Sequence, residues 1–296
     1  MTPDRWPSRT LRIGPASFHL RSPFRRVIDE VNALYRDYPA ETADGIYDYA
    51  VSAVPSSPLR RWVKPNLRLE CDFEPFDTLP LPVDLGMLGL EMGMNLQMAV
   101  GYRRHVVVHA ASSANGDKAA LLIGDSGAGK STLSALLAYR EGWRHLGDEF
   151  ALLDLHAPLL HPFPRPISLK NASIAAMEAR APADRFGPVL EGTVKGTIRH
   201  LLPPGAAIDT METPAEIALV VAPHFRENAA PAWRPMTRTE TYVRLAASST
   251  NQALMGEAGF EAVWRCLAHA PAFDIMYGSS DDALELFETL WRKVTA

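Results

Sequence analysis

Residues 124–131 constrain the possible folds of this chain more than any other part of its sequence. They read GDSGAGKS, which fits the pattern GxxxxGK[ST], and they lie between the apolar run ALLI and the helix-like run STLSALLAYR. Glycines and small side chains in such a loop let consecutive backbone N–H groups surround phosphates at a helix N-terminus. The segment therefore predicts a strand, a loop and a helix in succession, with nucleotide phosphates bound at the loop.

The side chains at the end of this loop have separate expected roles. Lys130 is expected to reach the outer phosphates, and the Ser131 hydroxyl is expected to ligate Mg²⁺. The predicted nucleotide-binding residues are Gly124, Asp125, Ser126, Gly127, Ala128, Gly129, Lys130, Ser131 and Thr132.

The sequence around the loop disfavours several classes of nucleotide-binding protein. A G protein would carry an NKxD-type motif and a transport ATPase an LSGGQ-type signature, and the sequence contains neither. Small metabolite kinases usually begin almost directly with the strand before the loop, whereas 123 residues precede Gly124 here. The class must therefore be read from the other motifs.

Two adjacent carboxylates form the second motif. Asp148 and Glu149 end the stretch GWRHLGDE, 18 and 19 residues after Lys130. Neighbouring side chains on a strand point to opposite faces, so at a strand end one carboxylate can face a metal and the other an acceptor hydroxyl. Two alternatives stay open: a solvated acidic turn, or Asp154, which follows the apolar run FALL, as the acid that holds the metal.

A β-hairpin is predicted directly before the loop. The runs HVVVHAA and AALLIG flank Asn115 and Gly116, a strong signal for a two-residue turn. With these as the turn residues, positions whose numbers sum to 231 face each other, and His109 lies opposite Leu122. His109 is then a candidate catalytic group or a hydrogen-bonded strand histidine. His105 shares its strand face, but without a third ligand the sequence predicts no metal site there.

Together these residues resemble the bacterial HPr kinase/phosphorylases and related proteins. The loop is close to that family's GDSGVGKS, and a Gly-x-Arg-containing segment leads into the paired acids. His109 stands 15 residues before Gly124, which is the spacing of the family's catalytic histidine. The segment AASSTNQALMG, residues 246–256, is similar to the family's AA-x-N…MG segment. The resemblance runs from about residue 105 to residue 296.

This resemblance implies an α/β fold with a P-loop kinase domain of the HPr kinase and phosphoenolpyruvate carboxykinase type over residues 104–296. The first hundred residues lie outside the resemblance, and their pattern predicts a small α+β domain over residues 1–103 that could recognise the acceptor. The implied activity is transfer of the ATP γ-phosphate, with Mg²⁺, to a serine hydroxyl of a protein or peptide. Glu149 stands where the family has an aspartate, and Thr132 stands where it has a glutamate.

The resemblance also assigns roles to residues. Glu149 would act as the base and Asp148 would support the site. The implied catalytic residues are His109, Lys130, Asp148 and Glu149, and the implied metal ligands are Ser131, Asp148 and Glu149. Glu191 is a further candidate metal ligand, and the candidate cations for a phosphate or an acidic substrate are Arg165, Lys170, Lys195, Arg199 and Arg226.

Two other functions stay open at this point. One is a nucleotide-dependent switch that binds ATP without transferring phosphate, and the other is a kinase for small hydroxyl compounds. The acceptor, the reverse phosphorolysis reaction, the preference for ATP over GTP, the oligomeric state and the choice between Asp148 and Glu149 as the base are also open. A homo-oligomer is compatible with the sequence.

Composition limits the partners and the compartment. With 30 Lys+Arg against 34 Asp+Glu and a net charge of -4, the chain lacks the basic excess of nucleic-acid-binding proteins. Its two cysteines fit a reducing compartment, and the first 14 residues lack the apolar core of a signal peptide, so we expect a cytoplasmic protein. Polar residues interrupt the apolar stretch 81–102, which predicts a buried helix with a Met-rich core face and no membrane association.

The remaining pattern predicts secondary structure in both domains. Ser22 and Pro23 are expected to begin a helix with apolar residues at helical spacing, followed by strands at 47–54 and 67–73. In the second domain, strands are expected at 145–155 and 216–223. Helices are expected around 260–267 and 286–294, the second capped near Ser279 or Ser280.

Overall fold

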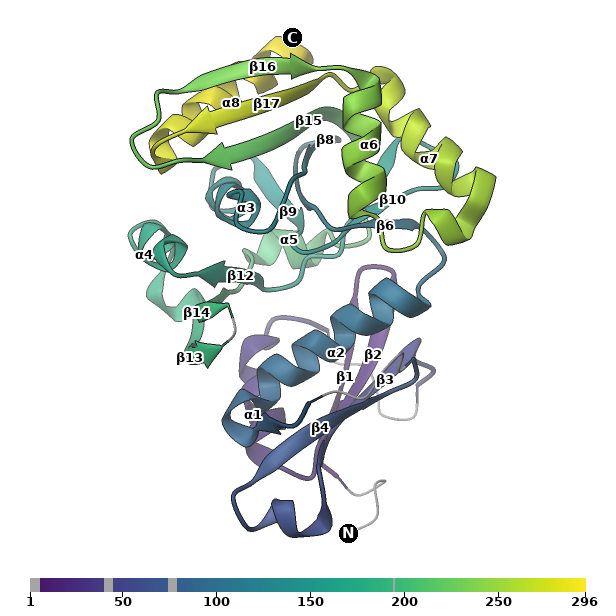
Figure 1. Ribbon diagram of the computed structural model, residues 1–296, viewed down its shortest axis with the longest axis vertical. Helices are drawn as coiled ribbons and strands as arrows, with labels where there is room; N and C mark the ends of the chain where they lie inside the picture. The colour runs from purple at the N-terminus through teal and green to yellow at the C-terminus, as the bar shows by residue number, and fades with distance from the viewer. Residues whose placement is uncertain (1–5, 40–44, 74–78, 194) are drawn as a thin grey trace. The chain divides into compact units, whose positions relative to one another are not determined.

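The chain has a mixed α/β structure with several sheets. A computed structural model describes residues 6–39, 45–73, 79–193 and 195–296. By its internal contacts the chain divides into two compact units, Met1–Tyr102 and Arg103–Ala296 (Figure 1). This division falls one residue before the domain boundary predicted from the sequence.

The first unit is built on a five-stranded sheet with strand order β1-β2-β3-β4-β5. Strands β2 and β3 are parallel, and the other neighbours are antiparallel. The strands are β1 (Ser8–Ile13), β2 (Ala16–Arg21), β3 (Tyr49–Pro55), β4 (Asn66–Cys71) and β5 (Leu81–Pro82), and the helices are α1 (Arg25–Leu34) and α2 (Gly86–Gly101).

Small residues bring α2 close to this sheet. A Cβ atom at Gly93 would overlap the Val51 side chain of β3, and one at Gly89 would lie 3.3 Å from Leu69 of β4. The glycines therefore allow the helix backbone to approach the strands more closely than larger residues would. None of the helices in the described part of the chain is long and apolar enough to cross a membrane.

The sequence predictions for this unit are confirmed in outline and wrong in detail. Strands β3 and β4 lie where strands were expected, but β1 and β2 were not predicted. Helix α1 begins at Arg25 instead of Pro23, because the Ser22 hydroxyl accepts a hydrogen bond from the Phe24 N–H, two residues on, and itself donates to the Ala53 carbonyl. The Met-rich face of α2 was expected to lie in the core, and Met87, Met94 and Met98 are buried there, but Met92 is 51% exposed.

The second unit contains a nine-stranded sheet and a separate three-stranded one. The large sheet runs in the order β6-β10-β11-β15-β8-β7-β9, and β17 joins β15 and carries β16 at its other edge. Its strands are β6 (Val106–Val108), β7 (Ala111–Asn115), β8 (Lys118–Leu122), β9 (Trp143–Gly147), β10 (Ala151–Leu153), β11 (Leu159–His161), β15 (Ala215–Phe225), β16 (Ala232–Met236) and β17 (Ala272–Tyr277).

The small sheet and the helices complete this unit. The small sheet has the order β12-β14-β13. Its strands are β12 (Ile167–Lys170), β13 (Phe186–Thr193) and β14 (Gly196–Leu201), and the helices are α3 (Lys130–Ala138), α4 (Ala172–Glu178), α5 (Gly205–Asp209), α6 (Arg238–Ser248), α7 (Gly256–His269) and α8 (Ser280–Thr295).

Helices cover both faces of the large sheet. Side chains of β8 alternate between two cores: Ala119 and Leu121 pack with residues of α6 and α7, whereas Ala120 and Leu122 pack with residues of α3 and α8. A strand that is buried on both faces reads as a continuous apolar run, as ALLI does. The chain leaves β8 at the sheet edge and enters α3 on one face, with the glycine-rich loop between them.

The predicted hairpin is confirmed as β7 and β8, but its predicted register is wrong by two residues. Asn115 pairs with Lys118, and Ala111 faces Leu122, so the turn residues are Gly116 and Asp117. Gly116 has a φ of 60°, and glycine adopts this left-handed conformation without the steric cost of a Cβ atom.

The predicted strand 145–155 is interrupted, whereas the later elements are confirmed. It divides into β9 and β10, and a tight turn at residues 148–150 separates them. Strand β15 and helices α7 and α8 lie where they were expected. The Ser279 hydroxyl caps α8 by accepting a hydrogen bond from the Asp282 N–H.

Candidate active site

Strand directions gather the predicted residues at one edge of the large sheet. Strand β7 lies between β8 and β9 and is antiparallel to both, so β8 and β9 run in the same direction. The loop after β8, the paired acids after β9 and His109 just before β7 therefore meet at one edge. His109 lies in the bend between β6 and β7 and not on a hairpin strand, and its N–H donates to the Ser248 carbonyl.

The glycine-rich loop needs its glycines for backbone conformation. Gly124, Gly127 and Gly129 have φ values of 133°, 86° and 107°, which residues other than glycine rarely adopt. A Cβ atom at Gly129 would also overlap the hydroxyl of Tyr277 at the end of β17. On the other side, the Phe225 N–H donates to the Ala128 carbonyl at 3.2 Å. Strands β15 and β17 thus hold the loop in place at the start of α3.

The Lys130 side chain folds back over this loop. Its Nζ donates to the carbonyl oxygens of Gly124 and Asp125 at 2.6 and 2.9 Å. The residue is only 7% exposed, and burial lowers the pKa of its ammonium group although nearby carboxylates oppose this shift. A buried ammonium group at a helix N-terminus is well placed for an anionic ligand.

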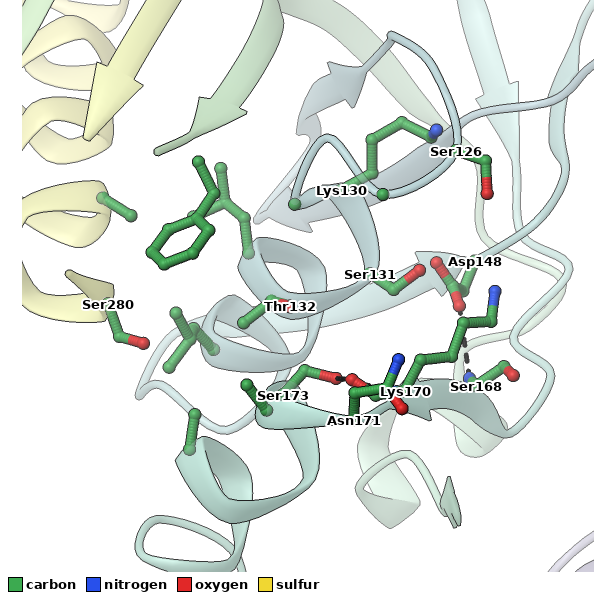
Figure 2. A pocket seen from close by; sticks show the side chains of 18 of the residues that line it. Ser126, Lys130, Ser131, Thr132, Asp148, Ser168, Lys170, Asn171, Ser173 and Ser280 are labelled. Carbon is green, nitrogen blue, oxygen red and sulfur yellow. Dashed lines mark hydrogen bonds between the residues drawn. The ribbon is translucent and has the colours of Figure 1, made fainter. Parts of the chain in front are cut away.

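Asp148 is a buried carboxylate beside Ser131 (Figure 2). Burial, followed by repulsion from Glu149, raises its pKa from 3.8 to about 6, while the Ser131 hydroxyl opposes the shift. Its Oδ2 accepts from the Ser168 N–H at 3.3 Å. Its Oδ1 has no hydrogen-bond partner among the residues that the structure describes. A buried carboxylate oxygen without a donor, next to a hydroxyl, is suited to ligate a hard cation.

Glu149 lies between a histidine and a lysine. Its Oε2 is 3.6 Å from His109 Nδ1, and its Oε1 is 3.5 Å from Lys170 Nζ. Burial acts to raise the pKa of Glu149, but the neighbouring Lys170 and His109, with smaller effects from Lys195 and Arg165, lower it overall. Glu149 is therefore ionised at neutral pH and can accept a proton.

The conformation of Glu149 is unusual for its residue type. Its φ is 61°, and the Phe150 N–H donates to the Asp148 carbonyl at 2.6 Å across this tight turn. A Cβ atom at Gly147 would approach the Phe150 carbonyl oxygen to 2.5 Å, so the turn also requires glycine there. The turn places the two acidic side chains side by side at the end of β9.

His109 completes the group around Glu149. Burial lowers its pKa, and the neighbouring Glu149 carboxylate opposes that shift without reversing it. The ring is therefore neutral near pH 7 and can accept or donate a hydrogen bond.

One cavity of about 520 Å³ connects these groups. Figure 2 shows Lys130, Ser131 and Asp148 on one side, with Lys170 and Asn171 approaching from β12 and α4. Of the nine predicted nucleotide-binding residues, six line this cavity: Ser126, Gly127, Gly129, Lys130, Ser131 and Thr132. The other three, Gly124, Asp125 and Ala128, contribute the backbone carbonyls described above.

Several candidates from the sequence do not line this cavity. Of the five cations, Lys170 and Lys195 line it, and Arg165 acts on Glu149 through its charge. Arg199 pairs instead with Glu178. Those outside the lining are Arg165, Arg199, Arg226, Glu191 and Asp154. Asp154 pairs with His161 and lies outside the lining of the cavity beside the loop, so the alternative that it holds a metal there is wrong.

Other lining residues were not found from the sequence. They come from distant segments: Ser168, Asn171, Ala172, Ser173 and Ala176 near α4, Phe225 at the end of β15, and Tyr277, Ser280 and Ala283 near α8. Asn171 has a φ of 52°, so it shares with Glu149 a positive φ, which is uncommon outside glycine. A positive φ at a non-glycine residue beside a cavity is a structural signal of function that the sequence does not carry.

Comparison with known proteins shows similarity to solved structures but not to family models or curated sequences. No protein-family model matches the chain, and no curated protein matches its sequence. Among solved structures, the chain is similar to the HPr(Ser) kinase/phosphatase from Coxiella burnetii, with 16% identity over 63% of this chain and 94% of that chain. The TM-score is 0.27. The function proposed below therefore depends on the residues around the cavity.

Proposed function

We propose that this chain is a kinase that transfers the γ-phosphate of ATP to a serine hydroxyl of a protein or peptide. The observation that supports it is the meeting of a buried lysine, a metal-competent carboxylate and an ionised glutamate around one cavity behind a glycine-rich loop. These are the groups that phosphoryl transfer requires: charge stabilisation, metal ligation and orientation of the nucleophile.

In this proposal the loop holds the phosphates of ATP. The backbone N–H groups at the start of α3 have no carbonyl partners within the helix, and they face the position of the phosphates. Lys130 Nζ exchanges the carbonyls of Gly124 and Asp125 for phosphate oxygens, which bear more negative charge.

Ser131 and Asp148 are the residues that would hold Mg²⁺. The donor-free Asp148 Oδ1 and the adjacent hydroxyl form an oxygen donor set, which Mg²⁺ prefers. When bound, Mg²⁺ neutralises negative charge on the outer phosphates.

Glu149 is the proposed base. The acceptor oxygen forms a bond to the γ-phosphorus while the bond from that phosphorus to the bridging oxygen of ADP breaks, and the hydroxyl proton passes to Glu149. His109 and Lys170 hold the carboxylate in position from its two sides. Lys170 and Lys195 also line the cavity. Their positive charges complement an acceptor that has acidic residues next to its serine.

The test is transfer of labelled γ-phosphate from Mg-ATP into a lysate of the source cells, with protein, peptide and metabolite fractions counted separately. The Lys130→Ala variant should lose the label. Lys118→Ala is a matched control, because Lys118 lies on β8 before the loop and pairs with Glu216 outside the cavity.

The fraction that contains the label decides among the three candidate functions. Label in protein or peptide that depends on Lys130 supports the proposal. Label only in low-mass compounds identifies a small-molecule kinase instead, and ATP binding without label in any fraction identifies a nucleotide switch.

A further inference from the structure

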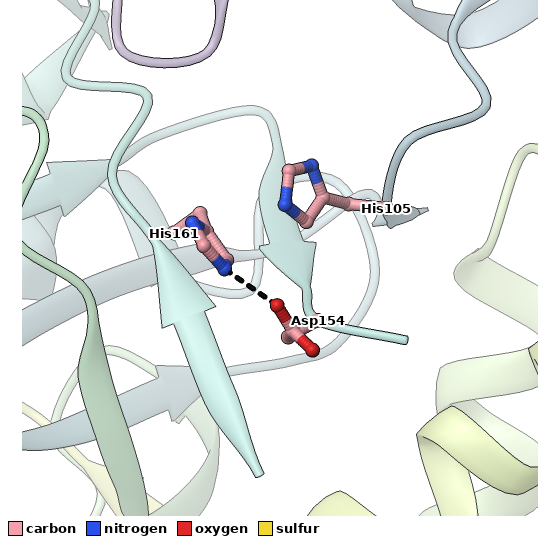
Figure 3. A group of neighbouring side chains, drawn as sticks. All are labelled: His105, Asp154 and His161. Carbon is pink, nitrogen blue, oxygen red and sulfur yellow. Dashed lines mark hydrogen bonds and ion pairs between the residues drawn. The ribbon is translucent and has the colours of Figure 1, made fainter. Parts of the chain in front are cut away.

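Three metal-competent side chains meet outside the candidate active site. They are His105, Asp154 and His161, and one potential ligand atom from each lies within 4.8 Å of the others. Figure 3 shows the three side chains facing one another from separate strand ends. His161 Nε2 lies 2.8 Å from Asp154 Oδ2, and the ring centroids of the two histidines are 4.2 Å apart.

Strand register explains why these residues converge. Strand β10 pairs with β6 so that Leu153 faces Val106, which places Asp154 opposite His105 one step further along. On its other edge β10 pairs with β11, and His161 faces Leu152, two residues from Asp154. Residues opposite each other, or two apart on one strand, share a sheet face. All three side chains therefore project from the same face.

Hydrogen bonds between side chains and backbone groups fix the positions of two of these residues. Asp154 Oδ1 accepts from the N–H groups of His156 and Ala157 at 2.7 and 2.9 Å, which orients Oδ2 toward His161. The Asn251 side chain donates to the His105 carbonyl and accepts from the Val107 N–H, at 2.9 and 2.8 Å. The contacts of Asp154 hold a ligand side chain in a fixed orientation, and those of Asn251 hold the backbone from which His105 projects.

The distances are close to those of a bound ion. Ligand atoms about 2.0–2.1 Å from zinc in a tetrahedral site lie roughly 3.3 Å from one another. Separations from 2.8 Å to at most 4.8 Å need only small side-chain rotations to reach this value. His105 is 9% exposed, while the side chains of Asp154 and His161 are 22% and 25% exposed, so the cluster is partly shielded.

We propose that His105, Asp154 and His161 bind a divalent transition-metal ion of the zinc type. Two imidazoles and one carboxylate form a donor set that favours zinc and similar ions over Mg²⁺. Three protein ligands leave a fourth position for water or another ligand. The inference does not depend on the proposed kinase activity, because none of the three residues lines the cavity.

The test uses the untagged full-length chain after treatment with a chelator. Zn²⁺ is titrated in competition with a chromophoric chelator, and Co²⁺ is titrated with detection of its visible absorption. We expect one ion per chain and imidazole ligation of Co²⁺. His105→Ala and His161→Ala should each weaken zinc binding by at least about tenfold. At the same zinc concentration, zinc should raise the melting temperature of the native sequence more than that of these variants.

Two controls make the result specific. His156→Ala removes an exposed imidazole next to the cluster but keeps the N–H that Asp154 accepts, so it should leave zinc affinity unchanged. Asp148→Asn removes a carboxylate from the other site and should also leave it unchanged. Loss of zinc in Asp148→Asn would place the ion at the nucleotide site and overturn the proposal.

A conservative variant covers the case in which the histidine variants do not fold. Asp154→Asn retains an oxygen that can accept the two backbone N–H groups and loses the charge that attracts the ion. A folded Asp154→Asn protein with weakened zinc binding supports the site. Unchanged zinc affinity in this variant, or in either folded histidine variant, contradicts it.

Discussion

At the scale of single residues, burial of the Asp148 carboxyl group lowers the stability of the folded chain as the pH rises above about 4. Its pKa is raised to about 6 in the folded chain, against 3.8 when it is exposed to solvent. Below pH 3.8 the group is protonated in both states and has no effect. Between pH 3.8 and about 6 the unfolded chain releases the Asp148 proton while the folded chain retains it, so stability falls across this interval and changes no further above it.

The variant Asp148→Asn tests this directly, because it removes the buried charge. In the absence of metal and nucleotide, its melting temperature relative to the native chain should rise from pH 4 to pH 7. The gain in unfolding free energy is at most roughly 3 kcal/mol, at about 1.4 kcal/mol per pH unit between the two pKa values. Thermal unfolding followed by circular dichroism at several pH values provides the measurement. A difference that does not change with pH would contradict this account of Asp148.

Glu149 should separate catalysis from nucleotide binding. Glu149→Gln keeps the size of the side chain and removes the proton acceptor, so transfer should fall by about 10²-fold or more. ATP affinity should stay close to that of the native chain, because the variant leaves the loop and Lys130 intact. Transfer assays and calorimetric titration of ATP check the two quantities. Undiminished transfer would remove Glu149 as the base.

At the scale of elements, the contact between Gly129 and Tyr277 couples the loop to β17. Gly129→Ala introduces both an unfavourable φ and an overlap with the Tyr277 hydroxyl. Gly127→Ala introduces only the unfavourable φ, because nothing lies within 4 Å of a Cβ atom there. We therefore expect Gly129→Ala to weaken ATP binding more than Gly127→Ala.

A second substitution should recover part of this loss. Tyr277→Phe removes the overlapping hydroxyl, so ATP should bind Gly129→Ala/Tyr277→Phe more tightly than Gly129→Ala alone. Calorimetric titration of the four chains gives the coupling between the two positions. If the effects of the two substitutions on the free energy of ATP binding are additive, the contact between Gly129 and Tyr277 does not determine the shape of the loop.

The sequence predicted those elements whose signal is local. The glycine-rich loop is one continuous motif, and a 3.6-residue apolar period marks α1, α7 and α8. The hairpin register was two residues off, because Gly116 and Asp117 supply the turn in place of the Asn-Gly pair. The motif spacing around His109 was sufficient to place it near the loop even so.

The missed parts of the site depend on distant strand pairing. Tyr277 reaches the loop only because β17 pairs in parallel with β15, and Lys170 reaches Glu149 from the separate small sheet. His105 and His161 are 56 residues apart in the sequence. They lie on the same face of the sheet because β10 pairs with β6 on one side and with β11 on the other. Single-sequence patterns carry no such pairing information, so these contacts could not be predicted.

At the scale of the whole molecule, each unit has its own sheet and its own helices. Both sheets of Arg103–Ala296 and every residue that lines the cavity belong to that unit. A unit with its own core can in principle fold alone. We expect residues 103–296, expressed separately, to bind ATP with the affinity of the full chain.

Phosphate transfer by the same fragment tests what the first unit does. If residues 1–102 recognise the acceptor, the fragment should bind ATP and lose transfer to the protein or peptide, and this loss should be seen as a higher KM for the acceptor. A fragment that transfers phosphate as well as the full chain would assign acceptor recognition to the second unit.

The left-handed backbone at Glu149 has a consequence for any attempt to make this protein more heat-resistant. A non-glycine residue at such a φ costs on the order of 1–2 kcal/mol, which glycine avoids. A library screened only for survival of heating would therefore enrich Glu149→Gly and discard the proposed base. Selection has to score phosphate transfer together with survival, because at this position the most stable amino acid and the most useful one differ.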